Sequence, residues 1–177
     1  TSLSTFLYYT RQTNSYYYYL TNDEYMEVYG IAASIGTRLK WPDDYFVLYN
    51  ELSWQQYKLK DWNYNCLFAN GKSNNLSYKV TLNRNSTDQP IYPRSGSEFS
   101  LSASFTPPYS LFDGKDYDNL AKDSKSPTYQ KELGEKYKWI EYYNLKFRSK
   151  TYTSLTNGTH NLVLMTRADF GILGSYT

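Results

Sequence analysis

Few side chains in this 177-residue sequence have the chemistry of an enzyme. The single histidine, His160, follows an Asn157-Gly158-Thr159 turn. One histidine in a turn is a poor basis for a histidine-based triad and cannot form a multi-histidine zinc site. The single cysteine, Cys66, cannot form an intrachain disulfide, and it falls in an expected loop. We therefore predict that the chain is not an enzyme and holds neither a metal nor an organic cofactor.

Neighbouring carboxylates occur at Asp43-Asp44 and at Asp23-Glu24, where an acid and a base could act together. Adjacent residues of a strand point to opposite faces, however, and adjacent acids in turns are usually solvated. The stretch 113–118, Asp-Gly-Lys-Asp-Tyr-Asp, is rich in oxygen ligands but lacks the spacing and the terminal Glu of a calcium-binding loop. We expect exposed acidic loops at all three places.

The composition differs from that of a soluble core. The chain has 22 Tyr and 4 Trp, whereas soluble cores consist mainly of Leu, Ile and Val. Strands with one apolar and one wet face suit this composition, and membrane barrels add girdles of Tyr and Trp at both interfaces. The net charge is +2 and no run of five basic residues occurs, so we expect no nucleic-acid partner.

The sequence has no run of 18 consecutive apolar residues and therefore predicts no transmembrane helix. A barrel strand crosses a membrane with about 9–11 tilted residues, so this leaves a membrane barrel open. The first four residues, 1–4, show neither the basic nor the apolar region of a signal peptide and include no initiator Met. We expect the chain to begin after processing or partway through a longer protein.

Alternation of apolar and polar residues is the dominant pattern, and helical periodicity is nearly absent. It is clearest in 76–83, Leu-Ser-Tyr-Lys-Val-Thr-Leu-Asn, and in 98–105, Glu-Phe-Ser-Leu-Ser-Ala-Ser-Phe. The pattern recurs in 29–40, 45–62, 143–148 and 161–172, and a further strand is expected over residues 1–12. The sequence thus predicts seven strands of roughly 11–17 residues, which is long for a soluble protein.

The alternation changes parity once, within 45–62. Apolar side chains begin at Phe46 and Leu48 and continue to Trp54, and then move to Tyr57 and Leu59. This shift predicts either a bulge or a strand that leaves the membrane.

The expected connections alternate in length, as they do at the two ends of a barrel. Long loops of an outer-membrane barrel lie outside, and shorter turns lie on the periplasmic side. The longest connection is in an odd position and the tightest in an even one, although the Pro- and Gly-rich connection at 86–97 is long for a periplasmic turn. In order the connections are 13–24, 41–44, 62–74, 86–97, 109–137 and 154–160.

Seven strands cannot close a barrel of the even-stranded bacterial kind. Open edges in hydrocarbon would leave backbone groups unsatisfied at several kcal/mol each, so further strands must come from elsewhere. The face opposite the apolar one carries charged residues that suit a water-filled lumen better than a sandwich core. These residues are Lys146, Arg148, Lys150, Arg167 and Asp169, of which Arg148, Arg167 and Asp169 are our lumen-facing candidates.

The most specific motif is the turn at 85–97, with Tyr92, Pro93, Arg94 and Gly96 at its centre. It resembles the aromatic-Pro-x-x-Gly turn that enters a mid-barrel strand in the Omp85 superfamily, and we expect it to be a structural turn. Three further passages, 39–46, 83–90 and 162–171, are similar in order and spacing to the barrel of BamA-type outer-membrane protein assembly factors. The resemblance covers most of the chain from about residue 25 onward.

The resemblance implies an all-β fold: an antiparallel up-and-down transmembrane β-barrel segment, about seven strands (the fifth to the eleventh) of a sixteen-stranded barrel. Residues 1–177 would then be a partial outer-membrane barrel domain, without periplasmic POTRA domains and without the first and last strands. The implied activity is the folding and insertion of β-barrel proteins into the outer membrane. The implied partners are the rest of the barrel, the POTRA domains, accessory lipoproteins, nascent outer-membrane proteins and outer-membrane lipid.

Other functions remain open. The chain could belong to another outer-membrane barrel, such as a porin, a passive transporter or another Omp85 exporter. A barrel enzyme would need His, Ser and carboxylates converging on one rim, which the sequence does not provide. A soluble β-sandwich, or a carbohydrate-binding domain with surface Tyr and Trp, is the alternative outside membranes.

Overall fold

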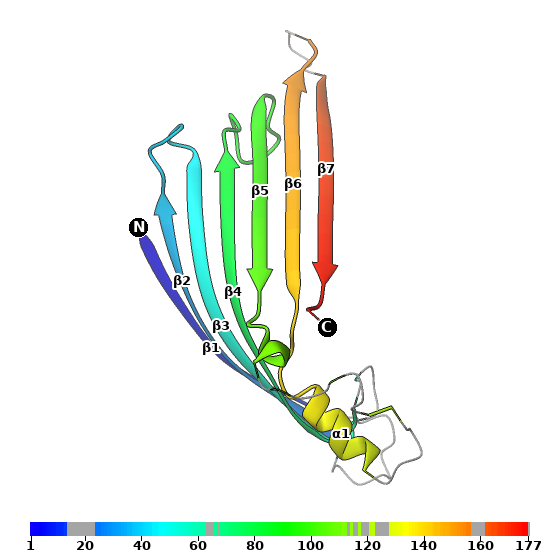
Figure 1. Ribbon diagram of the computed structural model, residues 1–177. Helices are drawn as coiled ribbons and strands as arrows, with labels where there is room; N and C mark the ends of the chain where they lie inside the picture. The colour runs from blue at the N-terminus through cyan, green and yellow to red at the C-terminus, as the bar shows by residue number, and fades with distance from the viewer. Residues whose placement is uncertain are drawn as a thin grey trace.

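Seven long strands form one sheet in the computed structural model of this chain (Figure 1). The structure describes residues 1–13, 24–62, 66, 68–112, 114, 117, 121–122, 128–156 and 162–176. The predicted His160 turn, Asp23 and most of the acidic stretch 113–118 lie outside these residues. No described helix is long and apolar enough to cross a membrane.

The strands follow one another in the sheet in chain order, each antiparallel to the next. The predicted all-β, up-and-down arrangement of seven strands is therefore confirmed. β-Branched, aromatic and other apolar residues at every second position suit this extended backbone. The strands are β1 (Ser2–Thr13), β2 (Tyr25–Arg38), β3 (Phe46–Lys60), β4 (Gly71–Asn85), β5 (Gly96–Phe105), β6 (Tyr143–Ser154) and β7 (Val163–Gly174).

Pairing between the strands is continuous. The β2–β3 ladder runs without interruption from Tyr25 opposite Lys60 to Arg38 opposite Val47, and the β3–β4 ladder is equally regular. A bulge would place two residues of one strand opposite one residue of its neighbour. Of the two alternatives for 45–62, the bulge is therefore wrong. The other, a strand that leaves the membrane, is left, and the change of parity in β3 needs a local cause.

That cause is a small core at one end of the sheet. Leu59, Phe68 and Leu133 are buried together, and Met26 and Tyr57 pack against them. Tyr57 and Leu59 point to the face opposite Phe46 and Trp54. The connection after β5, which contributes Leu133, covers that face, so apolar side chains are favourable there. The parity shift marks the place where β3 passes from the apolar band to this covered end.

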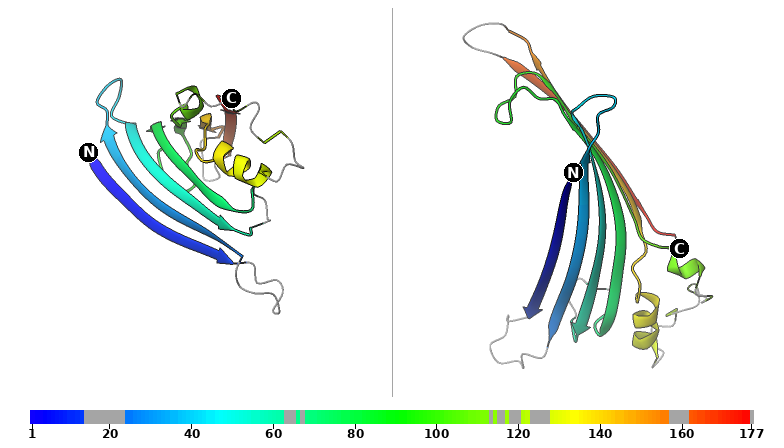
Figure 2. Two further views of the ribbon diagram at one scale, coloured as in Figure 1. Left: turned by 60° about the horizontal axis from the view of Figure 1, so that its bottom comes forward. Right: turned by 90° about the vertical axis from the view of Figure 1, so that its left-hand side faces the viewer.

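The long connection between β5 and β6 contains helical structure that the sequence pattern did not predict. It includes the 3-10 helix η1 (Tyr109–Leu111) and the helix α1 (Tyr129–Lys136). In Figure 2, α1 stands to one side of the strand ends. The helix has a single Leu as its aliphatic anchor, Leu133, so its pattern carries little periodic signal.

The same connection also covers a free strand edge. β4 extends beyond β5, since pairing between the two begins at Tyr78. There the Asn74 N–H donates to the Lys138 carbonyl (2.8 Å) and the Ile140 N–H donates to the Asn74 carbonyl (2.9 Å). Covering an exposed edge in this way removes a template for unwanted strand pairing.

Candidate functional site

One face of the sheet is a continuous apolar surface. Residues directly opposite each other in an antiparallel ladder point to the same side, so the registers assign every strand residue to a face. Leu3 and Leu7 are 71% and 80% exposed on it, values that water would penalise and lipid would favour. This apolar face carries Leu3, Leu7, Ile31, Ile35, Leu48, Leu52, Trp54, Leu76, Val80, Leu82, Leu101, Phe105, Leu145, Phe147, Leu164, Phe170 and Ile172.

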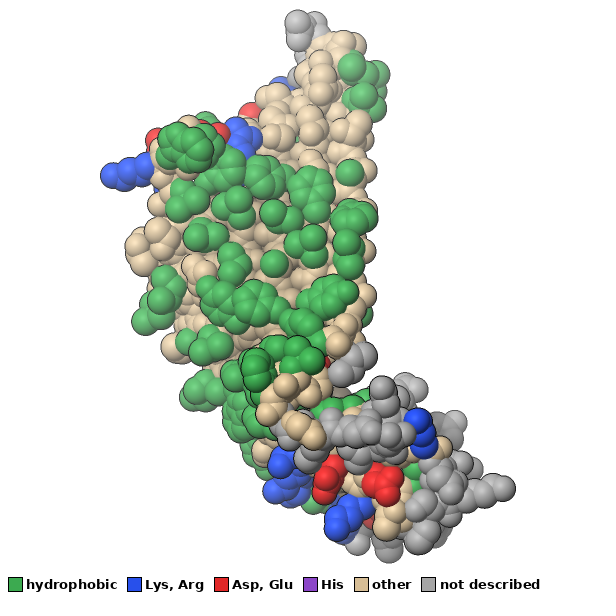
Figure 3. Space-filling model, in the orientation of Figure 1, with side chains coloured by type: hydrophobic (Ala, Val, Ile, Leu, Met, Phe, Trp, Pro, Cys, Tyr) green, Lys and Arg blue, Asp and Glu red, His purple; other side chains and the backbone are tan. Residues whose placement is uncertain are grey.

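The space-filling view shows this band of apolar side chains across the sheet, with charged side chains near its upper and lower borders (Figure 3). Along β3 it runs from Phe46 to Trp54. At 3.3 Å per residue and a tilt of about 40°, those eight steps rise roughly 20 Å, or about 25 Å with the side chains of the end rows. That matches the apolar height of an outer-membrane barrel.

A polar residue within the band has its partner on the next strand. Asn50 points to the apolar face of β3, and its Oδ1 accepts a hydrogen bond of 2.7 Å from the Tyr78 hydroxyl. An unpaired amide in hydrocarbon would cost several kcal/mol. This hydrogen bond satisfies the Asn50 side-chain carbonyl oxygen and so lowers the cost of a lipid-facing position.

The band ends at a salt bridge near the turn between β2 and β3. Arg84 donates to Asp43 through Nε and Nη2, both at 2.9 Å. Its guanidinium also lies 5.6 Å from the ring centre of Tyr45 and 5.7 Å from that of Phe46. Asp43 is therefore a structural anion at the border of the band, and the structure gives no support to an acid–base role for it.

The opposite, polar face holds all three lumen-facing candidates in one cluster. Arg148 and Asp169 are directly opposite in the β6–β7 ladder. The Arg148 Nε lies 2.8 Å from Asp169 Oδ1, and the Arg167 Nε lies 2.6 Å from Asp169 Oδ2. One carboxylate thus holds two guanidiniums side by side, and it leaves a net positive charge on this face.

A second ion pair lies on the same face, between Lys150 and Glu98 at 3.3 Å. Both pairs are partly exposed, so water is their natural medium. The sheet therefore separates an apolar surface from a charged one. Such a wall can divide lipid from a hydrated space.

The predicted turn motif forms a tight connection between β4 and β5. Asp88 Oδ1 accepts the backbone N–H groups of Arg94 (2.9 Å) and Ser95 (3.2 Å), and these hydrogen bonds lower the pKa of its carboxyl. Gly96 adopts φ = 103°, and a Cβ there would lie 2.3 Å from the Ser86 carbonyl oxygen. Only glycine can pass so close at this φ.

The other motif residues, Tyr92 and Pro93, lie at the tip of this turn, where Tyr92 is exposed and Pro93 is half-buried. Tyr92 has φ = 55°, a left-handed conformation uncommon for an aromatic residue, and it is 88% exposed. The turn therefore depends on Asp88 and Gly96 for its shape, while Tyr92 is presented to the surroundings. Asp88 is a residue that our sequence analysis did not single out.

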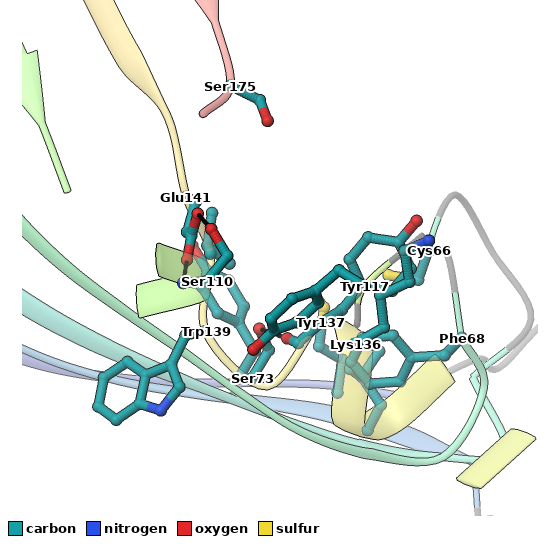
Figure 4. Close-up of a pocket in the computed structure, with 14 residues that line it drawn as sticks. Cys66, Phe68, Ser73, Ser110, Tyr117, Lys136, Tyr137, Trp139, Glu141 and Ser175 are labelled. Atoms are coloured by element: carbon teal, nitrogen blue, oxygen red, sulfur yellow. Dashed lines mark hydrogen bonds between the residues drawn. The ribbon is translucent and has the colours of Figure 1, made fainter. Parts of the chain in front are cut away.

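A cavity of about 640 Å³ lies beside the small core, between β2–β4 and the long connection (Figure 4). Apolar side chains from Met26, Leu59 and Phe68 form part of its wall, and the phenyl ring of Phe68 stacks on that of Tyr137. Glu141, at its rim, accepts hydrogen bonds from the backbone N–H and the hydroxyl of Ser110. The Glu141 carboxylate thus holds η1 in place.

Cys66 also lines this cavity. The residue is exposed, yet burial of its sulfur raises the pKa of the thiol, which lowers the fraction of reactive thiolate at neutral pH. Among the described residues, no cluster of three His, Cys, Asp or Glu side chains could hold a metal ion.

An open-edged antiparallel sheet with a lipid-compatible face and a charged face is a segment of a transmembrane β-barrel wall. The comparisons agree with this class. The model of the Omp85 superfamily domain matches residues 1–177. The chain belongs to the Omp85 superfamily.

A solved structure with a similar fold indicates which kind of barrel this chain resembles. The crystal structure of BamA from Haemophilus ducreyi lacking POTRA domains 1–3 matches with a TM-score of 0.60 over 98% of this chain, at 17% sequence identity. This chain spans 30% of that BamA chain. The predicted resemblance to part of a BamA-type barrel is thus confirmed at the level of fold, and no curated protein matches the sequence.

Proposed function

We propose that this chain is part of the barrel of an outer-membrane protein assembly factor, which folds and inserts β-barrel proteins into the outer membrane. The proposal rests on one observation. The sheet has one apolar and one charged face, and this Omp85 chain has the fold of part of the BamA barrel over 98% of its own length. On this proposal residues 1–177 are a partial barrel domain, and the polar face lines the lumen.

The edges of the sheet support the need for further strands. β1 pairs with β2 and β7 pairs with β6, so each outer strand presents one free edge to its surroundings within the described sheet. In hydrocarbon such edges must be paired. The rest of the barrel would supply the neighbours, and POTRA domains, lipoproteins and nascent barrel proteins would be partners beyond it.

The mechanism that we infer for the whole barrel is edge pairing. A seam between first and last strands would template an incoming strand by β-augmentation, without an energy-carrying cofactor. The seven strands described here would be the rigid wall away from that seam. Their long, regular ladders suit a scaffold that holds its shape while the seam opens.

The test uses the full-length protein reconstituted in lipid vesicles. An unfolded eight-stranded barrel protein is added, and its folding is followed by heat-modifiable migration on gels. We expect folding to be several times faster than in vesicles that hold an unrelated barrel of equal mass. Unchanged folding rates would refute the proposal.

A different outer-membrane barrel is the second candidate, and the charge of the polar face gives it a specific basis. The Arg148–Asp169–Arg167 cluster could select anions in a passive pore. Solute flux through the same vesicles distinguishes the two. Rapid anion flux without accelerated folding would favour the pore.

A further inference from the structure

A row of four charged residues crosses β1 to β4 on the apolar face, beyond the end of the apolar band. Arg11 is directly opposite Glu27, Glu27 is opposite Lys58, and Lys58 is opposite Lys72. We call Arg11, Glu27, Lys58 and Lys72 the charged row. It lies at the end of the sheet where the long connections are, so an assembly factor would present it at the outer surface of the membrane.

Glu27 is the buried residue of the charged row, and it contacts two of the cations. Its side chain is 9% exposed, and it accepts hydrogen bonds of 3.2 Å from the hydroxyl groups of Tyr9 and Tyr29. Lys58 Nζ lies 3.3 Å from one carboxylate oxygen, and Arg11 Nε lies 3.8 Å from the other. A single buried carboxylate thus holds two cations in defined positions.

An aromatic ring supports the same two cations. The Arg11 guanidinium lies 4.7 Å from the ring centre of Tyr25, and the Lys58 ammonium lies 5.4 Å from it. Their side chains remain 48% and 39% exposed, so both can still reach a ligand. The cations are therefore placed in advance by Glu27 and Tyr25 and remain available.

The charged row has more positive charge than its one acid can balance. Arg11, Lys58 and Lys72 contribute +3 and Glu27 contributes −1, which leaves +2. Like charges directly opposite each other destabilise a sheet, and Lys72 is an exposed lysine facing Lys58. Among the described residues no acid pairs with Lys72. An anion bound between the two lysines would relieve this repulsion.

The rows next to the charged row indicate what carries the anion. The next row toward the band is Tyr9, Tyr29, Gln56 and Asn74, and the one after it is Leu7, Ile31, Trp54 and Leu76. Charge is thus followed by aromatic and amide groups and then by apolar groups, in the order in which a lipid presents phosphate, ester or sugar, and acyl chain. A free phosphate ion would use the first row alone.

We propose that the charged row binds the phosphate of a phosphorylated lipid headgroup in the outer leaflet. This inference rests on the proposed function for the orientation of the barrel. Lys58 and Lys72 would donate charge-assisted hydrogen bonds to the phosphate oxygens, and Arg11 would add its guanidinium. The acyl chains would lie along the Leu7–Leu76 row below it.

The experiment measures lipid retained by the full-length protein in detergent, by native mass spectrometry. The probes are lipid A, which carries two phosphates, and the same lipid after removal of both phosphates. The double variant Lys58→Gln, Lys72→Gln is compared with Lys40→Gln, which removes an exposed lysine near the turn at the other end of the sheet. Heat-modifiable migration establishes that each variant folds.

We expect the double variant to lose roughly tenfold in affinity for lipid A, the effect of at least one charge-assisted hydrogen bond. Lys40→Gln should bind as the wild type does, and the dephosphorylated lipid should bind weakly to all three. Equal affinity of the double variant and the wild type for lipid A would overturn the proposal. Displacement of the lipid by low millimolar inorganic phosphate would also overturn it, in favour of a free-ion site.

The vesicle folding assay separates this inference from the proposed function. The double variant should accelerate barrel folding as well as the wild type does, because the charged row lies on β1 to β4, which the proposed function assigns to the wall away from the seam. A wild type that binds lipid A through its phosphates but fails to accelerate folding refutes the assembly function and supports the lipid site. Accelerated folding together with phosphate-independent lipid binding refutes the lipid site alone.

Discussion

Replacing Gly96 with alanine tests whether the turn before β5 is as tight as its geometry indicates. At φ = 103° an L-residue is strained, which costs about 1–2 kcal/mol. The new methyl group would also lie 2.3 Å from the Ser86 carbonyl oxygen and 2.8 Å from the Thr87 Cα. Both are backbone atoms, so relief requires the turn to move.

Moving the turn would disturb the hydrogen bond from the Ser86 N–H to the Ser97 carbonyl, which is 2.9 Å long and closes the β4–β5 hairpin. Overpacking of this kind costs roughly 1–3 kcal/mol. We therefore expect Gly96→Ala to lower the free energy of unfolding by about 2–5 kcal/mol in total.

Gly114→Ala is the matched control. Gly114 also has a positive φ, 65°, but no atom of the described residues lies within 4 Å of the position of its Cβ. It should lose about 1–2 kcal/mol from backbone strain alone. Urea unfolding of the full-length protein from lipid vesicles, followed by tryptophan fluorescence, measures both variants. Equal losses for the two glycines would refute the argument from close approach.

Two further predictions concern the loops. Leu133→Ala should destabilise the packing of α1 on Leu59 by about 2–4 kcal/mol and should speed protease cleavage within 106–142. Leu111→Ala is the control: this position is 68% exposed, so the cleavage rate should not change. The pKa of Asp88 is lower in the folded turn than in the unfolded chain, so its stabilising effect is present above the unfolded value of 3.8 and is lost as the pH falls through the folded value. Unfolding measured between pH 7 and pH 3 should show this loss in the wild type and a smaller one in Asp88→Asn; identical profiles would contradict the role of the Asp88 turn.

The amino-acid sequence by itself determined the seven strands and the two faces of the sheet. A strand repeats every two residues, so segments such as 76–83 and 98–105 display their face assignment locally. The polar side of β6 and β7, with Arg148, Arg167 and Asp169, followed from the same alternation. The two-ended layout of the connections followed from their lengths.

The tertiary structure decided how residues on different strands meet. The sequence pattern assigned Lys72 to the connection 62–74. In the structure β4 begins at Gly71, and the β3–β4 register makes Lys72 the neighbour of Lys58, because register depends on pairing between distant segments. Helix α1 was missed for a related reason: its eight residues are stabilised by Leu59 and Phe68, which lie more than 60 residues away in the chain. Local periodicity therefore specifies the wall, and long-range pairing specifies the charged row and the covered end.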